Sequence, residues 1–263
     1  MVRRGLLADT ASARAAIESG LVLVAGAPAT NPARLVGADQ PVGLVPPPKP
    51  YVSRGGTKLA GALARFPVPV AGRVALDAGS STGGFTDCLL QHGAARVVAV
   101  ELGRNQLHER LRADPRVDLR EQTDVRAVTI ESIGGPVALV VADLSSIPLR
   151  TMADAVLALA APAADLVLLV KPQYEAEAAE AARGRGVIAD PAIWRRALLG
   201  VIGTFDGRRA AIMGVMPSPL RGADGNVEFF VHVRAPGASA PTAVAVDHHA
   251  LVDAALAEVE AGT

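Results

Sequence analysis

The chain has 263 residues, 26 basic and 26 acidic side chains, 50% hydrophobic residues and one cysteine, Cys88. One cysteine excludes a disulfide-stabilised scaffold and a zinc site built from several cysteines. The hydrophobic content is typical of a globular protein and not of a disordered one. No apolar run reaches about 18 residues and no signal-peptide-like stretch opens the chain, so we expect a cytoplasmic protein without a membrane span.

The zero net charge is unevenly distributed along the chain. Residues 1–76 carry nine basic and three acidic side chains, a net charge of +6, and the remaining residues carry the compensating −6. A basic segment of this kind is a candidate surface for a polyanion such as RNA, and a chance cluster is the alternative. Only three of the 26 basic residues are lysine, so the other 23 are arginine; the lysines are Lys49, Lys58 and Lys171.

The first part of the chain predicts a small α+β module followed by a stiff linker. Residues 11–18 favour a helix, and short strand-like pieces follow it. Four prolines among residues 46–50 form an extended connector, which indicates a domain boundary. The predicted organisation is a small domain at 1–45, a linker at 46–56 and a larger domain at 57–263.

Beyond the linker, seven apolar runs predict β-strands, and helix-like segments separate the first six. The predicted strands are 73–76, 97–100, 117–119, 137–142, 166–170, 210–216 and 227–233. The predicted helices are 85–91, 105–111, 129–133, 149–160 and 191–205. This alternation indicates an α/β fold with a Rossmann-like, mostly parallel sheet, and the loop between the last two strands indicates an antiparallel pair. Such a sheet is typical of methyltransferases that use S-adenosylmethionine.

A glycine-rich loop, Asp-Ala-Gly-Ser-Ser-Thr-Gly-Gly-Phe, follows the first strand of this sheet. Its candidate cofactor-binding residues are Asp77, Gly79, Ser80, Thr82, Gly83, Gly84 and Phe85. Glycines let the backbone approach a ligand, and the helix that follows offers free N–H groups. Glu101 and Asp124 follow the next two strands, where acids are placed to hold a nucleoside. A generic α/β loop with incidental acids is the alternative.

Two of the three lysines are candidates for catalysis, Lys171 as a base and Lys58 as a charge that stabilises the developing alkoxide and positions the phosphate. Lys171 ends strand 166–170, and Asp143 ends the strand before it. Glu228 heads the last strand, and Lys58 lies on the segment that enters the domain. A partly desolvated lysine can remove the proton of a ribose 2′-hydroxyl without a metal, while carboxylates orient its amine. Chance placement of three lysines is the alternative.

Five motifs occur in an order that resembles the TlyA family. They are Arg-Gly-Gly-Thr-Lys-Leu, Asp-x-Gly-x-x-x-Gly-Gly-Phe, Ala-Asp-Leu-Ser, Leu-Val-Lys-Pro-Gln-Tyr-Glu, and Ser-Pro-Leu followed by Gly-Asn-Val-Glu-Phe-Phe. That family joins an S-four-type RNA-binding domain to an FtsJ-like methyltransferase domain. It methylates cytidine 2′-hydroxyls of 16S or 23S ribosomal RNA, which affects sensitivity to capreomycin-type antibiotics. The resemblance implies S-adenosyl-L-methionine as the cofactor and ribosomal RNA or a ribosomal subunit as the partner.

The resemblance also implies roles for individual residues. Lys171 is implied as the group that deprotonates the hydroxyl, and its supporting residues are Lys58, Asp143 and Glu228. At the cofactor, the implied contacts are Asp77, Gly79 and Gly83 for the methionine end, Glu101 for the ribose and Asp124 for the adenine, with Asp143 nearby.

Five arginines are candidate contacts to RNA phosphates: Arg3, Arg4, Arg14, Arg34 and Arg54. Such contacts position a protein on RNA without reading its bases, and solvated surface arginines are the alternative. Aromatic residues make up only 3% of the chain, so we expect recognition by shape and phosphate, or through a few flipped bases. The oligomeric state stays open between a monomer and a weak dimer.

Several features depart from the family's pattern. The chain starts at a point that corresponds to the inside of the family's first helix, which indicates either a misassigned start codon or a clipped first module, and either would weaken RNA docking. Ser146 stands where the family has an aromatic residue, and Asp124 stands where Asn is usual. Residues 176–185 predict a helix in place of a Gly/Lys-rich segment, which changes the lip of the substrate site.

Three other functions are weighed against this one. A non-catalytic RNA-binding or ribosome-assembly factor is disfavoured by the complete Lys-Asp-Lys-Glu set. A membrane-active haemolysin, a label that members of the family carry, is disfavoured because the sequence lacks a membrane span and a basic amphipathic helix. A dinucleotide-dependent dehydrogenase is disfavoured because Gly79 and Gly83 lie four residues apart, unlike the G-x-G-x-x-G pattern.

Overall fold

The computed structural model describes residues 1–45, 49–222, 224–237 and 246–262. They form two compact units, Met1–Lys49 and Pro50–Thr263. The prolines at 46–48, which the sequence predicts as the centre of the linker, lie outside the described residues. The larger unit begins at Pro50, so residues 50–56, predicted as linker, belong to its folded part.

The smaller unit has α+β character, in agreement with the pattern of its sequence. Its elements are the 3-10 helix η1 (Val2–Arg4), helix α1 (Thr10–Glu18) and strands β1 (Val22–Val24), β2 (Ala27–Pro28) and β3 (Val42–Leu44). The strands form an antiparallel sheet in the order β2-β1-β3. Helix α1 begins after Asp9, whose carboxylate accepts a hydrogen bond from the backbone N–H of Ser12.

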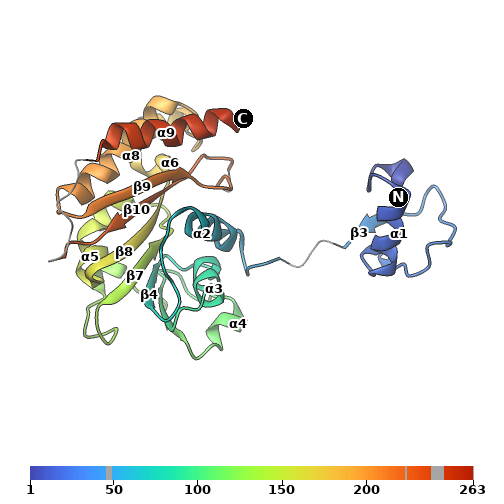
Figure 1. Cartoon of the computed structure of the whole chain (residues 1–263), viewed down its shortest axis with the longest axis horizontal. Coiled ribbons are helices and arrows are strands. Elements are labelled where there is room, and N and C mark those ends of the chain that lie inside the picture. Colours follow the sequence, from blue (N-terminus) through green and yellow to red (C-terminus); the bar gives the residue numbers. More distant parts are fainter. Residues whose placement is uncertain (46–48, 223, 238–245, 263) are drawn as a thin grey trace. The chain divides into compact units, whose positions relative to one another are not determined.

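The larger unit is built on a seven-stranded sheet in the order β6-β5-β4-β7-β8-β10-β9 (Figure 1). Its strands are β4 (Val74–Ala78), β5 (Arg96–Val100), β6 (Val117–Arg120), β7 (Val137–Ala142), β8 (Ala160–Val170), β9 (Ala211–Pro217) and β10 (Phe229–Arg234). Strands β4 to β8 run parallel, whereas β10 runs antiparallel to both β8 and β9. The predicted Rossmann-like α/β fold with an antiparallel final pair is confirmed.

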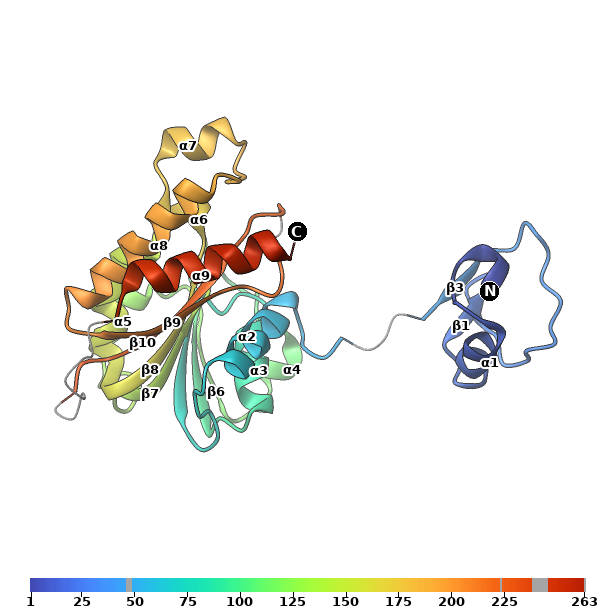
Figure 2. The ribbon, with the colours of Figure 1, turned by 45° about the horizontal axis from the view of Figure 1, so that its top comes forward.

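Helices cover both faces of this sheet (Figure 2). The α-helices are α2 (Arg54–Arg65), α3 (Gly84–Gln91), α4 (Glu109–Arg112), α5 (Ala153–Leu159), α6 (Pro172–Glu175), α7 (Ala178–Arg183), α8 (Pro191–Asp206) and α9 (His248–Ala261), with 3-10 helices η2 (Val125–Ala127) and η3 (Leu149–Met152). Side chains of α2, α3 and α4 pack on one face, and those of α5, α8 and α9 pack on the other. Successive strand residues alternate between faces, so Ala75 joins the first core and Leu76 the second.

Two predicted helices are wrong. Residues 105–111 are helical only at their end, in α4, because Asn105 adopts a positive φ of 56° that no α-helix accommodates. Residues 129–133 form turns in which Thr129 and Ser132 accept hydrogen bonds from each other's backbone N–H groups. In the second case, short polar side chains compete with the helical hydrogen-bond pattern.

Helix α2 is a long element that the sequence does not predict, since Gly55 and Gly56 lower the helix propensity of its first turn. Packing explains Gly56, because a Cβ atom there would lie 2.3 Å from the Tyr51 ring. A Cβ atom on Gly84, at the start of α3, would lie 2.8 Å from the Gly56 nitrogen and 3.1 Å from the Gly55 Cα. The two helices therefore begin in direct backbone contact, and α2 carries Lys58 over the sheet edge.

In the part of the chain that the structure describes, no helix is long and apolar enough to cross a membrane. Helix α9, which starts with His248 and His249, packs on β9 and α8 through Val252 and Ala255. Cys88 is fully buried in α3, and burial raises the pKa of its thiol to about 12, which suits a packing role.

A buried carboxylate links three segments near the edge at which β4 begins. Asp165 is 2% exposed and accepts hydrogen bonds from His232 (3.0 Å), Arg234 (3.0 Å) and Arg73 (2.8 Å). Burial alone raises the pKa of a carboxyl group, but the hydrogen bonds from His232, Arg73 and Arg234 outweigh it. The pKa of Asp165 therefore lies below its usual range.

We expect Asp165→Asn to lower the free energy of unfolding by about 3 kcal/mol, because it leaves a buried histidine and two arginines without their carboxylate. A carboxylate whose pKa is depressed in the folded state stabilises the protein above the unfolded pKa of about 3.9. This contribution disappears as the pH falls through the folded pKa. Urea unfolding should therefore show a stability gap between wild type and variant that is full near neutral pH and narrows below about pH 4. A gap that stays constant down to acid pH would contradict this assignment.

Candidate active site

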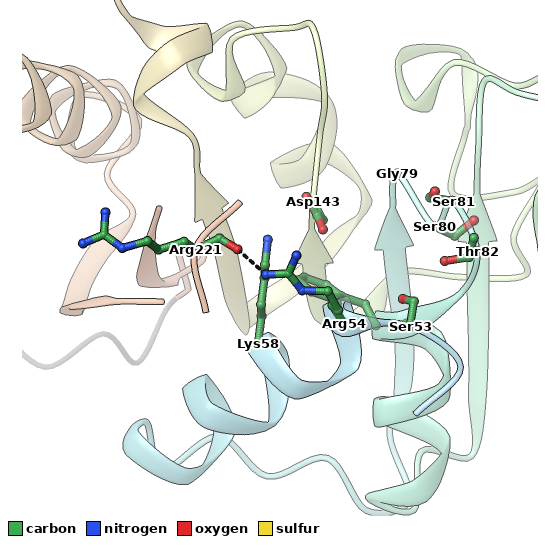
Figure 3. A pocket seen from close by; sticks show the side chains of 12 residues that line it. Ser53, Arg54, Lys58, Gly79, Ser80, Ser81, Thr82, Asp143 and Arg221 are labelled. Atoms are coloured by element: carbon green, nitrogen blue, oxygen red, sulfur yellow. Dashed lines mark hydrogen bonds between the residues drawn. The ribbon is translucent and has the colours of Figure 1, made fainter. Parts of the chain in front are cut away.

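Two adjoining cavities lie at the edge where the parallel strands end. The larger, of about 400 Å³, lies beyond β5, η2 and β7. The smaller, of about 190 Å³, lies between the glycine-rich loop and the start of α2 (Figure 3). Gly79, Ser81 and Asp143 line both cavities, so the two share one wall.

Lys171 and Asp143 meet at the ends of neighbouring strands, β8 and β7. The Lys171 Nζ lies 2.7 Å from Asp143 Oδ1 and donates a hydrogen bond to the Ser145 Oγ at 2.8 Å. The Tyr174 ring centroid is 5.9 Å from the same nitrogen, and the Lys171 side chain is only 11% exposed. A carboxylate, a hydroxyl and an aromatic ring thus restrict the position of the amine. Ser145, two residues beyond Asp143, is a contact that the sequence did not single out.

Lys58 and Glu228 form a second ion pair, which is buried. Their Nζ and Oε2 atoms are 2.5 Å apart, and their side chains are 9% and 3% exposed. The pair joins α2 to the head of β10, and Figure 3 shows Lys58 facing Asp143 across the smaller cavity. The structure therefore brings all four predicted catalytic residues to one edge of the sheet as two lysine–carboxylate pairs.

The glycine-rich loop forms the wall opposite α2. Gly79 has a φ of +84°, and a Cβ at this position would lie 2.6 Å from the carbonyl oxygen of Asp143, so only glycine fits. Four predicted loop residues line the smaller cavity along with Gly79: Ser80, Thr82, Gly84 and Phe85. Gly83 lines neither cavity, because it caps α3 and faces Leu107 and Leu111.

Glu101 and Asp124 both line the larger cavity. The two Glu101 oxygens accept hydrogen bonds from the backbone N–H groups of Ser81 (2.9 Å) and Gly103 (2.7 Å), so this acid also fixes the loop. Hydrogen bonds from Arg126 hold the pKa of Asp124 below its usual range, which keeps its carboxylate ionised. The side chains that the sequence did not single out here come from segments without a motif: Leu102, Gln106, Thr123, Ile147 and Met152.

Asp77 lies beneath the two cavities and lines neither of them. It is fully buried, and its Oδ2 accepts a hydrogen bond from the Thr86 hydroxyl at 2.6 Å. Burial, with the nearby negative charges of Asp143 and Glu101, raises the pKa of Asp77 to about 7. Among the described residues, its Oδ1 and the Ser80 Oγ are buried without a hydrogen-bond partner. Ser80 lines the smaller cavity, and a buried polar atom without a partner beside a cavity can bond a polar ligand.

This set of side chains fits S-adenosylmethionine. Carboxylates at successive strand ends suit its ammonium and ribose hydroxyl groups, and Leu102, Ile147 and Met152 suit the faces of its adenine. The shared wall at Gly79 and Asp143 lets one extended ligand occupy both cavities. Ser146 lines the larger cavity with a φ of +67°, so the departure at this position affects the cofactor side of the site.

The predicted RNA-binding arginines differ in their surroundings. Arg3, Arg14 and Arg34 are exposed in the smaller unit. Arg4 donates hydrogen bonds to the carbonyls of Gly37, Ala38 and Gln40, so it also holds a loop. In the larger unit, Arg54 lines the smaller cavity and donates a hydrogen bond to the backbone carbonyl of Arg221 at 2.8 Å.

The sheet order and the cofactor-shaped site define an S-adenosylmethionine-dependent methyltransferase. Residues 51–235 match the FtsJ-like methyltransferase family. The 16S/23S rRNA (cytidine-2′-O)-methyltransferase TlyA of Mycobacterium tuberculosis is 46% identical over 89% of this chain and 87% of that protein. Hemolysin A of Brachyspira hyodysenteriae is 34% identical over 87% of this chain and 95% of that protein. A solved structure from Streptococcus thermophilus, titled as a haemolysin, aligns with a TM-score of 0.71 at 32% identity, covering 99% of this chain and 94% of the other.

The chain therefore belongs to the TlyA family of FtsJ-like methyltransferases, and its cofactor is S-adenosyl-L-methionine.

We expect the raised pKa of Asp77, a predicted contact of the cofactor's methionine end, to make cofactor binding depend on pH. A cationic ligand favours the ionised carboxylate, so binding releases a proton when the free protein still holds it. Affinity should therefore be full above about pH 7 and weaken by up to about tenfold per unit as the pH falls below that value. Calorimetric titration with S-adenosylmethionine between acid and mildly alkaline pH measures this slope. Asp77→Asn should bind more weakly at alkaline pH and lose the slope, and an unchanged slope in this variant would assign the proton to another group.

Proposed function

We propose that this protein transfers the methyl group of S-adenosylmethionine to the 2′-hydroxyl of a cytidine in ribosomal RNA. The observation that supports this most directly is the pairing of Lys171 with Asp143, since Asp143 lines both cavities. Identity to the mycobacterial cytidine methyltransferase over most of the chain supports the substrate. The proposal also includes a target nucleotide in 16S or 23S RNA and an effect on sensitivity to capreomycin-type antibiotics.

Binding comes first in the proposed mechanism. Glu101 and Asp124 hold the nucleoside part of the cofactor in the larger cavity, while Asp77, Ser80 and the loop glycines surround its methionine end. When bound, the cofactor supplies a methyl group that its sulfonium has already activated. The protein therefore has to position the ribose oxygen in line with that group and remove one proton.

Lys171, in its neutral form, accepts the proton of the 2′-hydroxyl at Nζ. Asp143 and Ser145 hold this nitrogen in place before transfer, and Asp143 stabilises the ammonium that forms. With the cofactor bound, its methyl group would pass from the sulfonium to the ribose oxygen, and the products would be 2′-O-methylcytidine and S-adenosylhomocysteine. Lys58, held by Glu228 at the smaller cavity, offers a positive charge to the developing alkoxide.

RNA docking involves both units in this proposal. The smaller unit acts as an S-four-type RNA-binding domain, with Arg3, Arg14 and Arg34 as phosphate contacts. Arg4 contributes with the N–H groups that its hydrogen bonds to the loop carbonyls leave unused. The proposal includes a cytoplasmic location, because the proposed substrate is ribosomal RNA. The haemolysin names of some relatives do not change this proposal, because the described residues form a methyltransferase site with both lysine–carboxylate pairs in place.

Lys171→Ala should abolish methyl transfer, with a loss of roughly 100-fold to 10,000-fold in the rate of the chemical step, because it removes the base. Primer-extension mapping of 2′-O-methylation on unmodified ribosomal RNA measures the product, and calorimetry with S-adenosylmethionine checks that cofactor binding is retained. Lys49→Ala is a matched control, since Lys49 is exposed and lies outside the larger unit. If wild-type protein leaves every ribose unmodified, the proposed function is wrong; if Lys171→Ala stays active, only the assignment of the base fails.

A further inference from the structure

The arginines of the larger unit fall into two groups. Of its 19 arginines, 13 form an ion pair with a carboxylate. Within the described parts of the chain, the six that form none are Arg54, Arg104, Arg183, Arg185, Arg209 and Arg221. An exposed guanidinium without a carboxylate keeps its full charge and its fork of donors available for an external anion.

Five of these six arginines either line the smaller cavity or belong to segments that follow a strand at the edge of the sheet that carries the active site. Arg54 and Arg221 line the smaller cavity. Arg104 follows β5, and Arg183 and Arg185 follow α6 beyond Lys171. Arg209 is the exception, because it precedes β9, whose first residue pairs with the last residue of β10 at the opposite edge.

Asn226 connects two of the arginine-bearing segments. It is 2% exposed, its Nδ2 donates to the Gly186 carbonyl at 2.8 Å, and its Oδ1 accepts from the Ile188 N–H at 2.9 Å. Its own carbonyl accepts from the N–H of Gly222 at 2.9 Å. Asn226, which lies two residues before Glu228, therefore links the segment of Arg185 through its side chain to the loop of Arg221 through its backbone.

Arg54, on α2, also holds the loop that contains Arg221. It donates to the Arg221 carbonyl, which leaves most of its N–H groups unused. Figure 3 shows that the Arg221 guanidinium points away from Lys58 and Asp143, toward the outside of the cavity. Asp224, the acid of this loop, forms no ion pair with either arginine within the described residues. The outward direction suits a strand that lies across the cavity more than it suits the cofactor inside it.

The distribution of charge along the sequence does not reveal where these unpaired arginines gather in the fold. Residues 1–49 carry five basic and three acidic side chains, so the smaller unit accounts for only +2 of the +6 counted over residues 1–76. Three of the other four basic residues, Lys58, Arg65 and Arg73, are paired with acids in the fold. Arg54 alone remains unpaired in that stretch.

We propose that Arg54, Arg185 and Arg221 form a phosphate-binding rim that holds the RNA backbone at the mouth of the smaller cavity. The inference rests on the proposed function and adds to it a second RNA-binding surface, in the methyltransferase unit itself. Guanidinium groups match phosphate geometry, and phosphates on both sides of the target nucleotide would hold its ribose over Lys58 and Lys171. The rim acts on RNA position and takes no part in the proton transfer.

The double variant Arg185→Gln/Arg221→Gln tests the rim in the full-length protein and leaves the Arg54 hydrogen bond to the main chain intact. The probe is a fluorescein-labelled oligocytidylate RNA, followed by anisotropy over a range of salt concentrations. Each lost phosphate contact lowers the slope of log affinity against log salt by about 0.7, so the double variant should lose about 1.4 and bind on the order of tenfold more weakly at moderate salt. Methyl transfer to ribosomal RNA should show a raised KM with little change in kcat.

Arg209→Gln is the matched control, because it removes an equally exposed and unpaired arginine at the opposite edge of the sheet. It should keep the wild-type salt slope and KM. A double variant that binds RNA like Arg209→Gln would overturn the rim while leaving the methyltransferase function in place. A wild-type protein that binds RNA with the expected slopes but methylates no ribose would instead overturn the proposed function. Calorimetry with S-adenosylmethionine should give equal affinities for both variants, and a loss confined to the double variant would show that its cavity, and not its rim, had changed.

Discussion

The buried ion pair between Lys58 and Glu228 is the constraint on which the rest of the site depends. It joins residues 170 positions apart in the chain, from the first helix of the larger unit to its last strand. A charge buried without its partner costs several kcal/mol, so α2 and β10 must stay together whenever the protein is folded. That requirement closes the smaller cavity on one side and holds a positive charge beside Asp143. A Cβ on Gly84, at the start of α3, would lie 2.8 Å from the Gly56 nitrogen, so glycine at that position lets α2 and α3 meet closely.

The second lysine–carboxylate pair, Lys171 with Asp143, is less completely buried than the first. Lys171 and Asp143 lie at the ends of parallel strands and keep some exposure, 11% and 23% of their side chains. The first pair thus holds the architecture together, whereas the second lies where a substrate proton can reach it. The neighbouring cofactor wall is acidic, with Glu101 and Asp124 held by backbone groups and by Arg126. In the proposed arrangement, the acids face the cationic cofactor and the unpaired arginines face the anionic RNA strand, so the two ligands have separate surfaces at the same edge of the sheet.

Much of the fold was predictable from periodicity alone. All seven strands of the large sheet overlap a predicted apolar run, because strands in the middle of such a sheet are buried on both faces and are apolar at nearly every position. The predictions failed where local and tertiary effects compete. Asn105 in the left-handed region stops a helix that the composition favours. Contact with α3 stabilises α2 despite two glycines that disfavour it. The pattern of residues in the sequence cannot predict how closely α2 and α3 pack against each other.

For the site, too, one part follows from the sequence and another only from the tertiary structure. The sequence by itself determined the candidate catalytic set, because lysines are rare in this chain and both of those at the site lie, like their acids, in recognisable motifs. It also determined the cofactor loop, because glycine is the residue that fits beside Asp143. Only the tertiary structure decided which acid pairs with which lysine, which side chains fill the cavity walls, and which arginines keep an unpaired charge. The physical reason is that ion pairing depends on distance in space: most of the arginines are paired inside the fold, and a count along the chain cannot distinguish them from those left facing solvent.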